Sequence, residues 1–162
     1  MFRHLLIALA ALGSPVLASD CLITLAPSPA FTPPTPHAPN AEASSVGAPN
    51  HFWYGTDALW TALSFTGSWH ALPHDSKGYS QKVFVWSKDY DPKKEPQPNL
   101  VITGKRLDGD SPSFGNEHST NAGFADGTTA MLAGVNIPSL GCWEITSQYR
   151  GHTLTFVVAV EP

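Results

Sequence analysis

Hydrophobic and polar residues alternate most regularly at the end of the chain, in residues 143–149 and 152–160. The apolar residues fall on odd positions in the first range and on even positions in the second: Trp143, Ile145 and Tyr149, then Leu154, Phe156, Val158 and Val160. A period of two is typical of a strand with one buried face. Arg150-Gly151 lies between the two ranges and predicts a two-residue turn, because glycine readily adopts positive φ.

A two-residue turn fixes the register of the predicted hairpin. The expected pairs are Tyr149 with His152, Ile145 with Phe156, and Trp143 with Val158. Odd positions on one strand then face even positions on the other, so both apolar rows lie on the same face of the hairpin. We therefore expect this face to belong to the core.

Shorter apolar segments predict further strands at residues 59–65, 82–86, 100–107 and 130–135. Residues 82–86 are apolar on both faces, as in a strand from the middle of a sandwich. Residues 108–128 are rich in Gly, Ser, Asn and Asp and predict a long loop. Five to seven short strands separated by turn signals predict an all-β, Ig-like antiparallel β-sandwich at residues 51–162.

The start of the chain has the pattern of a secretory signal peptide at residues 1–18. Arg3 supplies a positive charge, residues 5–12 are apolar, and Val16 and Ala18 provide the small residues of a cleavage site. A core helix is the alternative interpretation. We expect the mature protein to begin near Ser19 and to be exported, to the periplasm or the extracellular space.

Residues 19–50 form a Pro-rich extended segment, since repeated prolines lack the backbone donors of a sheet interior. We interpret this segment as a tether between the signal peptide and the folded domain. Phe31 is the one large apolar residue in its middle and could dock on the domain.

Cys21 and Cys142 are the only cysteines, and in an exported chain they predict one disulfide. Asp20 occupies the place where a lipid-modified bacterial protein has a small residue, so we do not expect lipid anchoring at Cys21. Cys142 has even parity and points away from the Trp143 row. The disulfide would place the start of the mature chain on the outer face of the hairpin. In that arrangement Leu22, Ile23 and Leu25 could cover Val157 and Ala159.

Charge and hydropathy exclude two classes of partner. The formal net charge is −4, and the basic residues are scattered along the chain. A nucleic-acid-binding protein would carry a basic patch, so no nucleic acid is expected as a partner. No apolar run of the mature chain is long enough to span a bilayer as a helix.

Three segments resemble a family of small exported bacterial proteins without an assigned function. These are the aromatic block 52–60, the strand 82–86, and the Gly-Cys-Trp-Glu-Ile-Thr sequence at 141–146. The resemblance covers the chain from about Cys21 to its end. It implies an envelope-associated or secreted sandwich and adds no chemistry.

The histidines and acids suggest a metal site only weakly. His70 and His74 are four residues apart, with Asp75 adjacent, but Gly67 and Pro73 favour a loop, in which that spacing carries little information. A site built from His51, His70, His74 and His118 would require several loops to converge. The acids Asp108, Asp110, Glu117 and Asp126 share one loop without EF-hand spacing.

No motif identifies catalysis, because the chain has no Gly-x-Ser-x-Gly sequence. We therefore assign no catalytic residue, metal ligand or cofactor. Trp53, Tyr54 and Trp69 are candidate ligand-contact aromatics, which could stack on sugar rings or bind a protein partner. Packing in the core is the alternative role of these aromatics.

We expect an exported, non-catalytic β-sandwich with a binding or envelope-structural role and an unknown protein or carbohydrate ligand. The alternative is a small metal-binding or hydrolytic exported protein that uses loop histidines and acidic residues.

Overall fold

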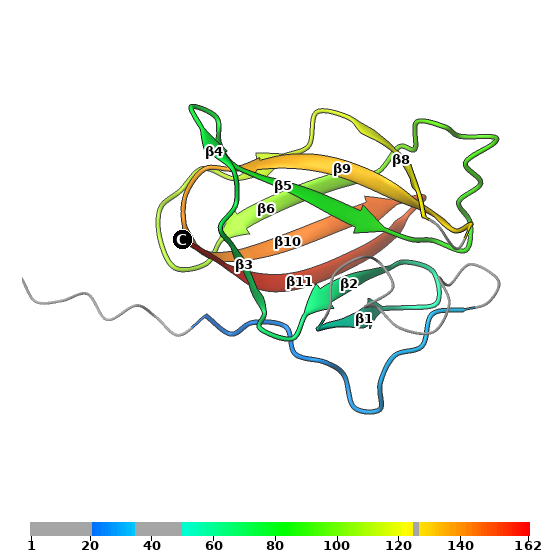
Figure 1. Cartoon of the computed structure of the whole chain (residues 1–162), viewed down its shortest axis with the longest axis horizontal. Helices are drawn as coiled ribbons and strands as arrows, with labels where there is room; N and C mark the ends of the chain where they lie inside the picture. The colour runs from blue at the N-terminus through cyan, green and yellow to red at the C-terminus, as the bar shows by residue number, and fades with distance from the viewer. Residues whose placement is uncertain (1–20, 35–49, 125–126) are drawn as a thin grey trace, which may run out of the picture.

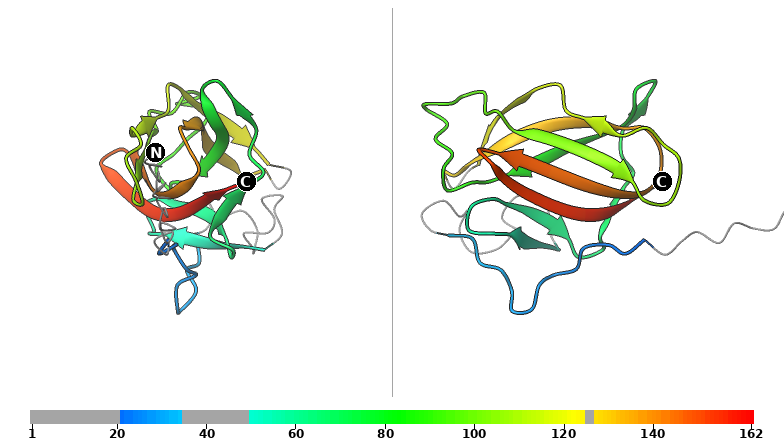
Figure 2. Two further views of the ribbon diagram at one scale, coloured as in Figure 1. Left: turned by 90° about the vertical axis from the view of Figure 1, so that its left-hand side faces the viewer. Right: turned by 180° about the vertical axis from the view of Figure 1, so that it is seen from behind.

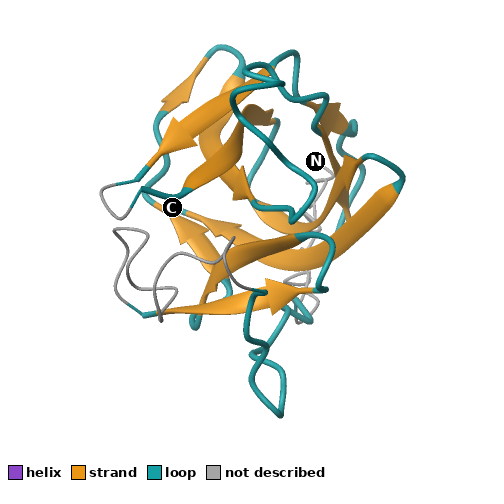
Figure 3. Ribbon diagram, turned by 90° about the vertical axis from the view of Figure 1, so that its right-hand side faces the viewer, coloured by secondary structure: helices purple, strands orange, loops and turns teal. Residues whose placement is uncertain are grey.

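The computed structural model describes residues 21–34, 50–124 and 127–162, and these residues contain strands and loops but no helix (Figure 3). The strands are β1 (His51–Gly55), β2 (Trp60–Ser64), β3 (Ser68–His70), β4 (His74–Asp75), β5 (Gly78–Val85), β6 (Val101–Arg106), β7 (Phe114–Gly115), β8 (Ser119–Gly123), β9 (Thr129–Ile137), β10 (Gly141–Tyr149) and β11 (His152–Glu161). The predicted signal peptide and part of the Pro-rich segment lie outside the described residues.

The strands form three sheets, which confirms the all-β class (Figure 1). The larger sheets have the orders β3-β11-β10-β6-β7 and β4-β5-β9-β8, and β1 and β2 form a separate hairpin. Residues of both larger sheets share one core, which gives a sandwich-like arrangement. One pair departs from the expected antiparallel pattern, because β3 runs parallel to the C-terminal strand β11.

The β10–β11 hairpin has the predicted register at every pair, including Tyr149 with His152 and Trp143 with Val158. Both turn residues have positive φ, 48° at Arg150 and 80° at Gly151. A turn of this kind matches the twist of the flanking strands. The row predicted to face the core is buried throughout: Trp143, Ile145, Tyr149, Leu154, Phe156, Val158 and Val160.

The other predicted strands are present with altered bounds. Residues 82–85 belong to a longer strand, β5, and Trp86 follows it in an isolated bridge to Trp60, with residues 83–86 covered on both faces as expected. Val83 and Val85 lie in the main core, whereas Phe84 and Trp86 face a second cluster. β6 and β9 correspond to the predicted strands at 100–107 and 130–135.

Three expectations require correction. The predicted loop at 108–128 contains β7 and β8, which pair with β6 and β9 through backbone groups and show no apolar alternation. The short strands β1, β3 and β4 were not predicted. The strand predicted at 59–65 ends at Ser64, and Phe65 is 58% exposed because it lies where the chain turns, with its N–H bonded to Asn50.

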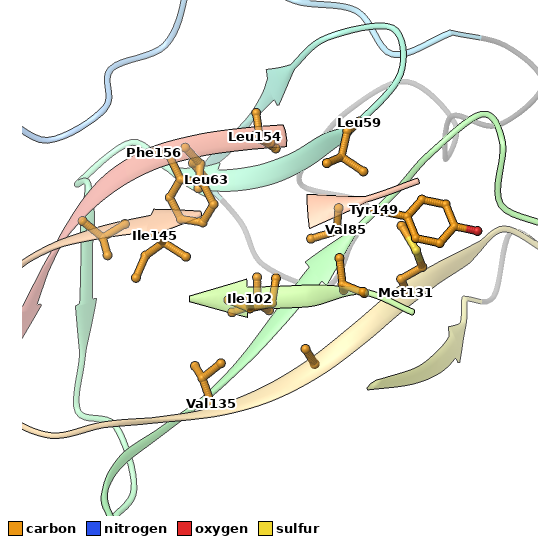
Figure 4. Packing of buried hydrophobic residues seen from close by; sticks show 14 of the residues in the cluster. Leu59, Leu63, Val85, Ile102, Met131, Val135, Ile145, Tyr149, Leu154 and Phe156 are labelled. Carbon is orange, nitrogen blue, oxygen red and sulfur yellow. The ribbon is translucent and has the colours of Figure 1, made fainter. Parts of the chain in front are cut away.

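The main core lies between the two larger sheets and extends to one face of the β1–β2 hairpin (Figure 4). Leu59 and Leu63 pack there with Phe156, Leu154 and Ile145 from the C-terminal hairpin. Burial of each such side chain contributes about 1.5–3 kcal/mol, so the core joins the sheets into one unit.

A second group of aromatic residues covers the other face of the β1–β2 hairpin. We call it the outer aromatic cluster: Trp53, Trp60, Trp86 and Ala130, with Phe31, Ala62, Phe84 and Phe124 packed against them. The indole N–H groups of the three tryptophans are buried without a hydrogen-bond partner in the described residues. Apolar packing therefore stabilises this cluster, and Phe31 docks on the domain as the sequence suggested.

The disulfide between Cys21 and Cys142 is present, with their Cα atoms 5.4 Å apart. Thr24 continues the attachment to β11: its N–H donates to Val157 O at 3.0 Å, and its Oγ1 accepts from Val157 N–H at 2.8 Å. Residues 21–34 then run beneath the β1–β2 hairpin (Figure 2).

The apolar cover expected on the outer face of the hairpin is only partly formed. Leu22 and Leu25 are 85% and 68% exposed, so they do not cover Val157 and Ala159. Ile23 packs instead against Gly67, where a Cβ would collide with its side chain. The two hydrogen bonds between Thr24 and the Val157 backbone set this orientation and leave the flanking leucines in solvent.

Candidate ligand-binding site

β2 meets the chain just after β5 through one antiparallel residue pair, Trp60 with Trp86. Trp60 N–H donates to Trp86 O at 3.0 Å and Trp86 N–H donates to Trp60 O at 2.8 Å. Next to this pair the Thr61 hydroxyl donates to Phe84 O at 2.7 Å. β2 and β5 form no ladder with each other, and the opening between them is lined in part by β3, which follows β2 in the chain (Figure 1).

The opening contains a cavity of about 310 Å³, which we call the wedge cavity. Its lining comes from β2, β3 and β5, with one residue each from β1 and β11 and two from the adjoining loops: His51, Thr61, Ala62, Leu63, Ser64, Ser68, Trp69, His70, Leu72, Gln81, Lys82, Val83, Phe84, Trp86 and Phe156. The cavity size and the mixture of apolar walls with a few polar groups are typical of small-ligand sites.

Trp69 is the main aromatic wall on the β3 side. β3 pairs with β11, which places Trp69 opposite Val160. The Trp69 ring meets Phe156 edge-on, with the ring centroids 6.2 Å apart, and its side chain is half-buried. The tryptophan is therefore fixed by the core on one side while another part of its surface borders the cavity.

Among the described residues that line the wedge cavity, Lys82 carries the one formal charge. Lys82 is exposed on β5, and no Asp or Glu lies among the lining residues, although the whole chain has a net charge of −4. His51 and His70 also line the cavity. A single lysine and no acid in the described lining favour a ligand that is neutral or acidic.

The three candidate ligand-contact aromatics lie in different places. Trp69 lines the wedge cavity. Tyr54 is half-buried against the main core, and its hydroxyl donates to Thr155 O at 3.3 Å. Trp53 is only 6% exposed and meets Trp86 edge-on at 5.2 Å, so it cannot serve as the exposed platform considered for it. Both faces of β1 are apolar, so the alternation of residues along this strand could not show which of its aromatic side chains would be buried.

The histidines considered for a metal site do not gather. His51 and His70 line the wedge cavity, His74 packs against Tyr79 with their ring centroids 4.3 Å apart, and His118 lies between β7 and β8. His70 and His74 belong to the strands β3 and β4 and not to the predicted loop. Within residues 21–34, 50–124 and 127–162, no group of three or more His, Cys, Asp or Glu residues could hold a metal ion.

The serines of the wedge cavity are not arranged as nucleophiles. The Ser64 and Ser68 hydroxyls lie 2.8 Å and 3.2 Å from Thr66 Oγ1, within the turn between β2 and β3. A hydrolytic serine would be hydrogen-bonded to a base. Of the acids in the predicted loop, Asp108 is paired with Arg106 at 2.7 Å, and Asp126 lies outside the described residues.

Sequence reasoning named Trp69 as a candidate ligand contact, and His51 and His70 only as candidates for a metal site, but missed the other walls of the wedge cavity. Lys82 begins the strand predicted at 82–86 and Gln81 precedes it, yet their place in the cavity wall depends on where β2 lies. No local sequence pattern predicts the angle between two strands that are distant in the chain. The position of Lys82 and Gln81 in the cavity wall can therefore be seen only in the tertiary structure.

The chain matches no protein family model, and it matches neither a curated protein nor a solved structure. In the part of the chain that the structure describes, no helix is long and apolar enough to cross a membrane.

Proposed function

We propose that this protein is an exported, non-catalytic binding protein that holds its ligand in the wedge cavity. The observation that carries the proposal is the cavity itself, with its volume of about 310 Å³, its wall at Trp69 and its rim at Lys82. Cavities with apolar walls and a few oriented polar groups are the usual sites of ligand binding.

Export is supported by three features. The Cys21–Cys142 disulfide indicates an oxidising compartment. The signal pattern at residues 1–18 and the resemblance to small exported proteins agree with that compartment, which we take to be the periplasm or the extracellular space. We also propose an Ig-like relationship for the two facing sheets. N-terminal sequencing of the expressed protein should find Ser19 first, and an intact Met1 would contradict export.

A binding role accounts for the cavity better than the hydrolytic or metal-binding alternative. The wedge cavity has no carboxylate in its lining, and its two serine hydroxyls contact Thr66. A purely structural role in the envelope remains the competing proposal, and it differs by requiring no ligand in the cavity.

The test is ligand binding to the mature protein with its disulfide intact. Panels of oligosaccharides and of short peptides, the two ligand classes that an aromatic wall such as Trp69 can contact, are screened by thermal shift and then by calorimetry. Trp69→Ala should weaken binding about tenfold or more, because a buried aromatic contact contributes over 1 kcal/mol. Phe65→Ala is the matched control, since Phe65 is an exposed aromatic outside the cavity.

Thermal unfolding of both variants shows whether each remains folded. Failure of both panels, or a ligand whose affinity is the same for folded Trp69→Ala and wild type, would overturn the proposal.

A further inference from the structure

A second hollow of about 450 Å³ adjoins the wedge cavity, and we call it the Gly134 hollow. Its lining includes Ser80, Gln81 and Lys82 from β5, and Gly134 and Asn136 from β9. Gln81 and Lys82 also line the wedge cavity. The two spaces therefore meet at this part of β5, and one ligand could occupy both of them.

The Gly134 hollow lies on the outer face of the sheet that contains β5 and β9. Val83 and Val85 face the main core, so Lys82, at an alternate position, faces outward. Gly134 is the ladder partner of Lys82 and shares its face. Neighbouring strands are about 5 Å apart, so a ligand that leaves the wedge cavity past Lys82 reaches Gly134 after a short extension.

Gly134 is a glycine that the fold itself does not require. It lies inside β9, where glycine destabilises a strand relative to other residues. Its φ is not positive, and a Cβ built on it would meet no atom of the described residues within 4 Å. Neither a turn nor close packing therefore explains it. A glycine in the interior of a strand often marks a place where a ligand approaches the main chain.

Two side-chain amides line the Gly134 hollow, and the protein holds each of them by its oxygen atom. Gln81 Oε1 accepts from the Lys82 N–H at 2.9 Å, and Asn136 Oδ1 accepts from the Ser80 hydroxyl at 3.0 Å. The NH₂ group of each amide then points away from the atom that holds its oxygen. These two donors and the exposed Lys82 suit a ligand that is rich in hydroxyl oxygens.

The edge of β5 beside these spaces already bonds to other parts of the protein. Phe84 O accepts from the Thr61 hydroxyl at 2.7 Å, and Ser80 N–H donates to Pro73 O at 2.8 Å. An extended peptide would recognise a strand edge through main-chain hydrogen bonds. Because Thr61 and Pro73 occupy this edge, side chains are the groups that can hold a ligand here.

We propose that the wedge cavity binds an oligosaccharide that continues into the Gly134 hollow, an inference that rests on the proposed function. One sugar ring packs against Trp69 in the cavity, and a following ring lies over Gly134. Gln81 and Asn136 donate from their amides to hydroxyl oxygens of the second ring. A sugar ring has apolar C–H faces and a rim of hydroxyls, which matches an aromatic wall followed by fixed donors.

The first test screens the mature, disulfide-bonded protein on a glycan array and then shortens the bound glycan one ring at a time. Calorimetry measures the affinity of each fragment. The affinity should rise about tenfold or more at the length at which the glycan reaches the second space, since new contacts then form. Equal affinities at all lengths, or an array without a bound glycan, would overturn the inference.

The second test fills the hollow with Gly134→Leu, a change for which the structure has room. The variant should bind the longer fragments about tenfold more weakly and the shorter fragments within about twofold of the wild type. Trp69→Ala should instead weaken every fragment that binds. Asn136→Ala removes one donor without filling the hollow, and it should also weaken only the longer fragments.

Gly123→Leu is the matched control. Gly123 is an exposed glycine on β8 of the same sheet, it lines neither space, and a Cβ there also meets no described atom within 4 Å. Its substitution should leave the affinity of every fragment within about twofold, and thermal unfolding shows whether each variant is folded. Equal losses for the two leucine variants, or no loss in both Gly134→Leu and Asn136→Ala, would contradict a second subsite.

The outcomes also separate this inference from the proposed function. If a peptide binds in a Trp69-dependent way and no oligosaccharide does, the oligosaccharide inference is wrong and the binding function stands. If neither class binds, both are wrong.

Discussion

The hydroxyl of Tyr149 donates a hydrogen bond of 2.6 Å to Oε2 of Glu95, a residue 54 positions earlier in the chain. Arg150 donates to the same oxygen at 2.9 Å, and its other terminal nitrogen donates to Asp89 O at 2.7 Å. The end of β10 and the first residue of the hairpin turn thus hold the long loop between β5 and β6. Burial and the contact with Glu95 raise the pKa of Tyr149, so its hydroxyl remains a donor at physiological pH.

This contact predicts a pH dependence of stability. The hydrogen bond from Tyr149 is the main cause that lowers the pKa of Glu95 below its usual 4.5, with further help from Asn99 N–H and Arg150. A carboxyl with a lowered folded-state pKa stabilises the fold above its unfolded pKa, and this stability is lost as pH falls through the folded value. Urea unfolding should therefore show a loss of stability from about pH 5 downward.

Glu95→Gln isolates this contribution from that of other acids. The variant should be about 1 kcal/mol less stable at pH 7, since a hydrogen bond to a charged acceptor is replaced by a neutral one. Its stability should also fall less on acidification than that of the wild type. Parallel pH profiles for the two proteins would contradict the role assigned to Glu95.

The register of the C-terminal hairpin predicts unequal costs at adjacent positions. Phe156 is buried in the main core, so Phe156→Ala should lower the free energy of unfolding by about 3–5 kcal/mol. Thr155 is exposed and contacts Thr146 Oγ1 at 3.2 Å, so Thr155→Ala should cost less than half as much. Denaturant unfolding compares them, and similar losses at both positions would show that the faces are assigned wrongly.

The C-terminal hairpin could be predicted from sequence because its information is local. Alternation, the Arg150-Gly151 turn and the parity of Cys142 together fixed its register and the direction of its disulfide. β8 could not be predicted in the same way, since its sequence Ser-Thr-Asn-Ala-Gly pairs with β9 through backbone groups alone. Backbone hydrogen bonds between strands do not require an apolar side-chain pattern, so such a strand leaves no pattern in the sequence.

The candidate site was less predictable than the fold for a related reason. Trp53 and Trp69 are both tryptophans in short apolar segments, yet one is buried on Trp86 and the other borders the wedge cavity. Lys82 gave no signal, because its importance depends on the divergence of β2 from β5. Burial of an aromatic residue is set by what packs on it from distant parts of the chain, and no window of sequence contains that information.

The third prediction concerns the stability cost of substituting Gly67, which lies where residues 21–34 contact the domain. Its φ is +65°, and a Cβ there would collide with Ile23. Gly67→Ala should cost about 1–3 kcal/mol, because backbone strain adds to the displacement of Ile23. Gly123→Ala is the matched control, since a Cβ at Gly123 meets nothing within 4 Å. Equal stabilities of the two variants would contradict the packing of Ile23 against Gly67.

The disulfide gives the last prediction, because it closes a loop of 121 residues between Cys21 and Cys142. Removal of both cysteines by Cys21→Ser and Cys142→Ser should lower the free energy of unfolding by about 4–5 kcal/mol, on the chain-entropy account of a loop this long. Non-reducing mass spectrometry of the wild type should find the bond, and two free thiols or a lipid on Cys21 would contradict it.

Amide exchange then distinguishes two contributions of the disulfide. If it acts only by restricting the unfolded chain, native exchange at Val157 should rise no more than the loss of global stability requires. If it also holds Thr24 against β11, as the bonds of 3.0 Å and 2.8 Å indicate, Val157 should lose more protection than its neighbours in β11. We expect the second result, because the N–H of Val157 then loses its acceptor, the Thr24 hydroxyl. Uniform loss of protection along β11 would show that Thr24 stays docked without the disulfide.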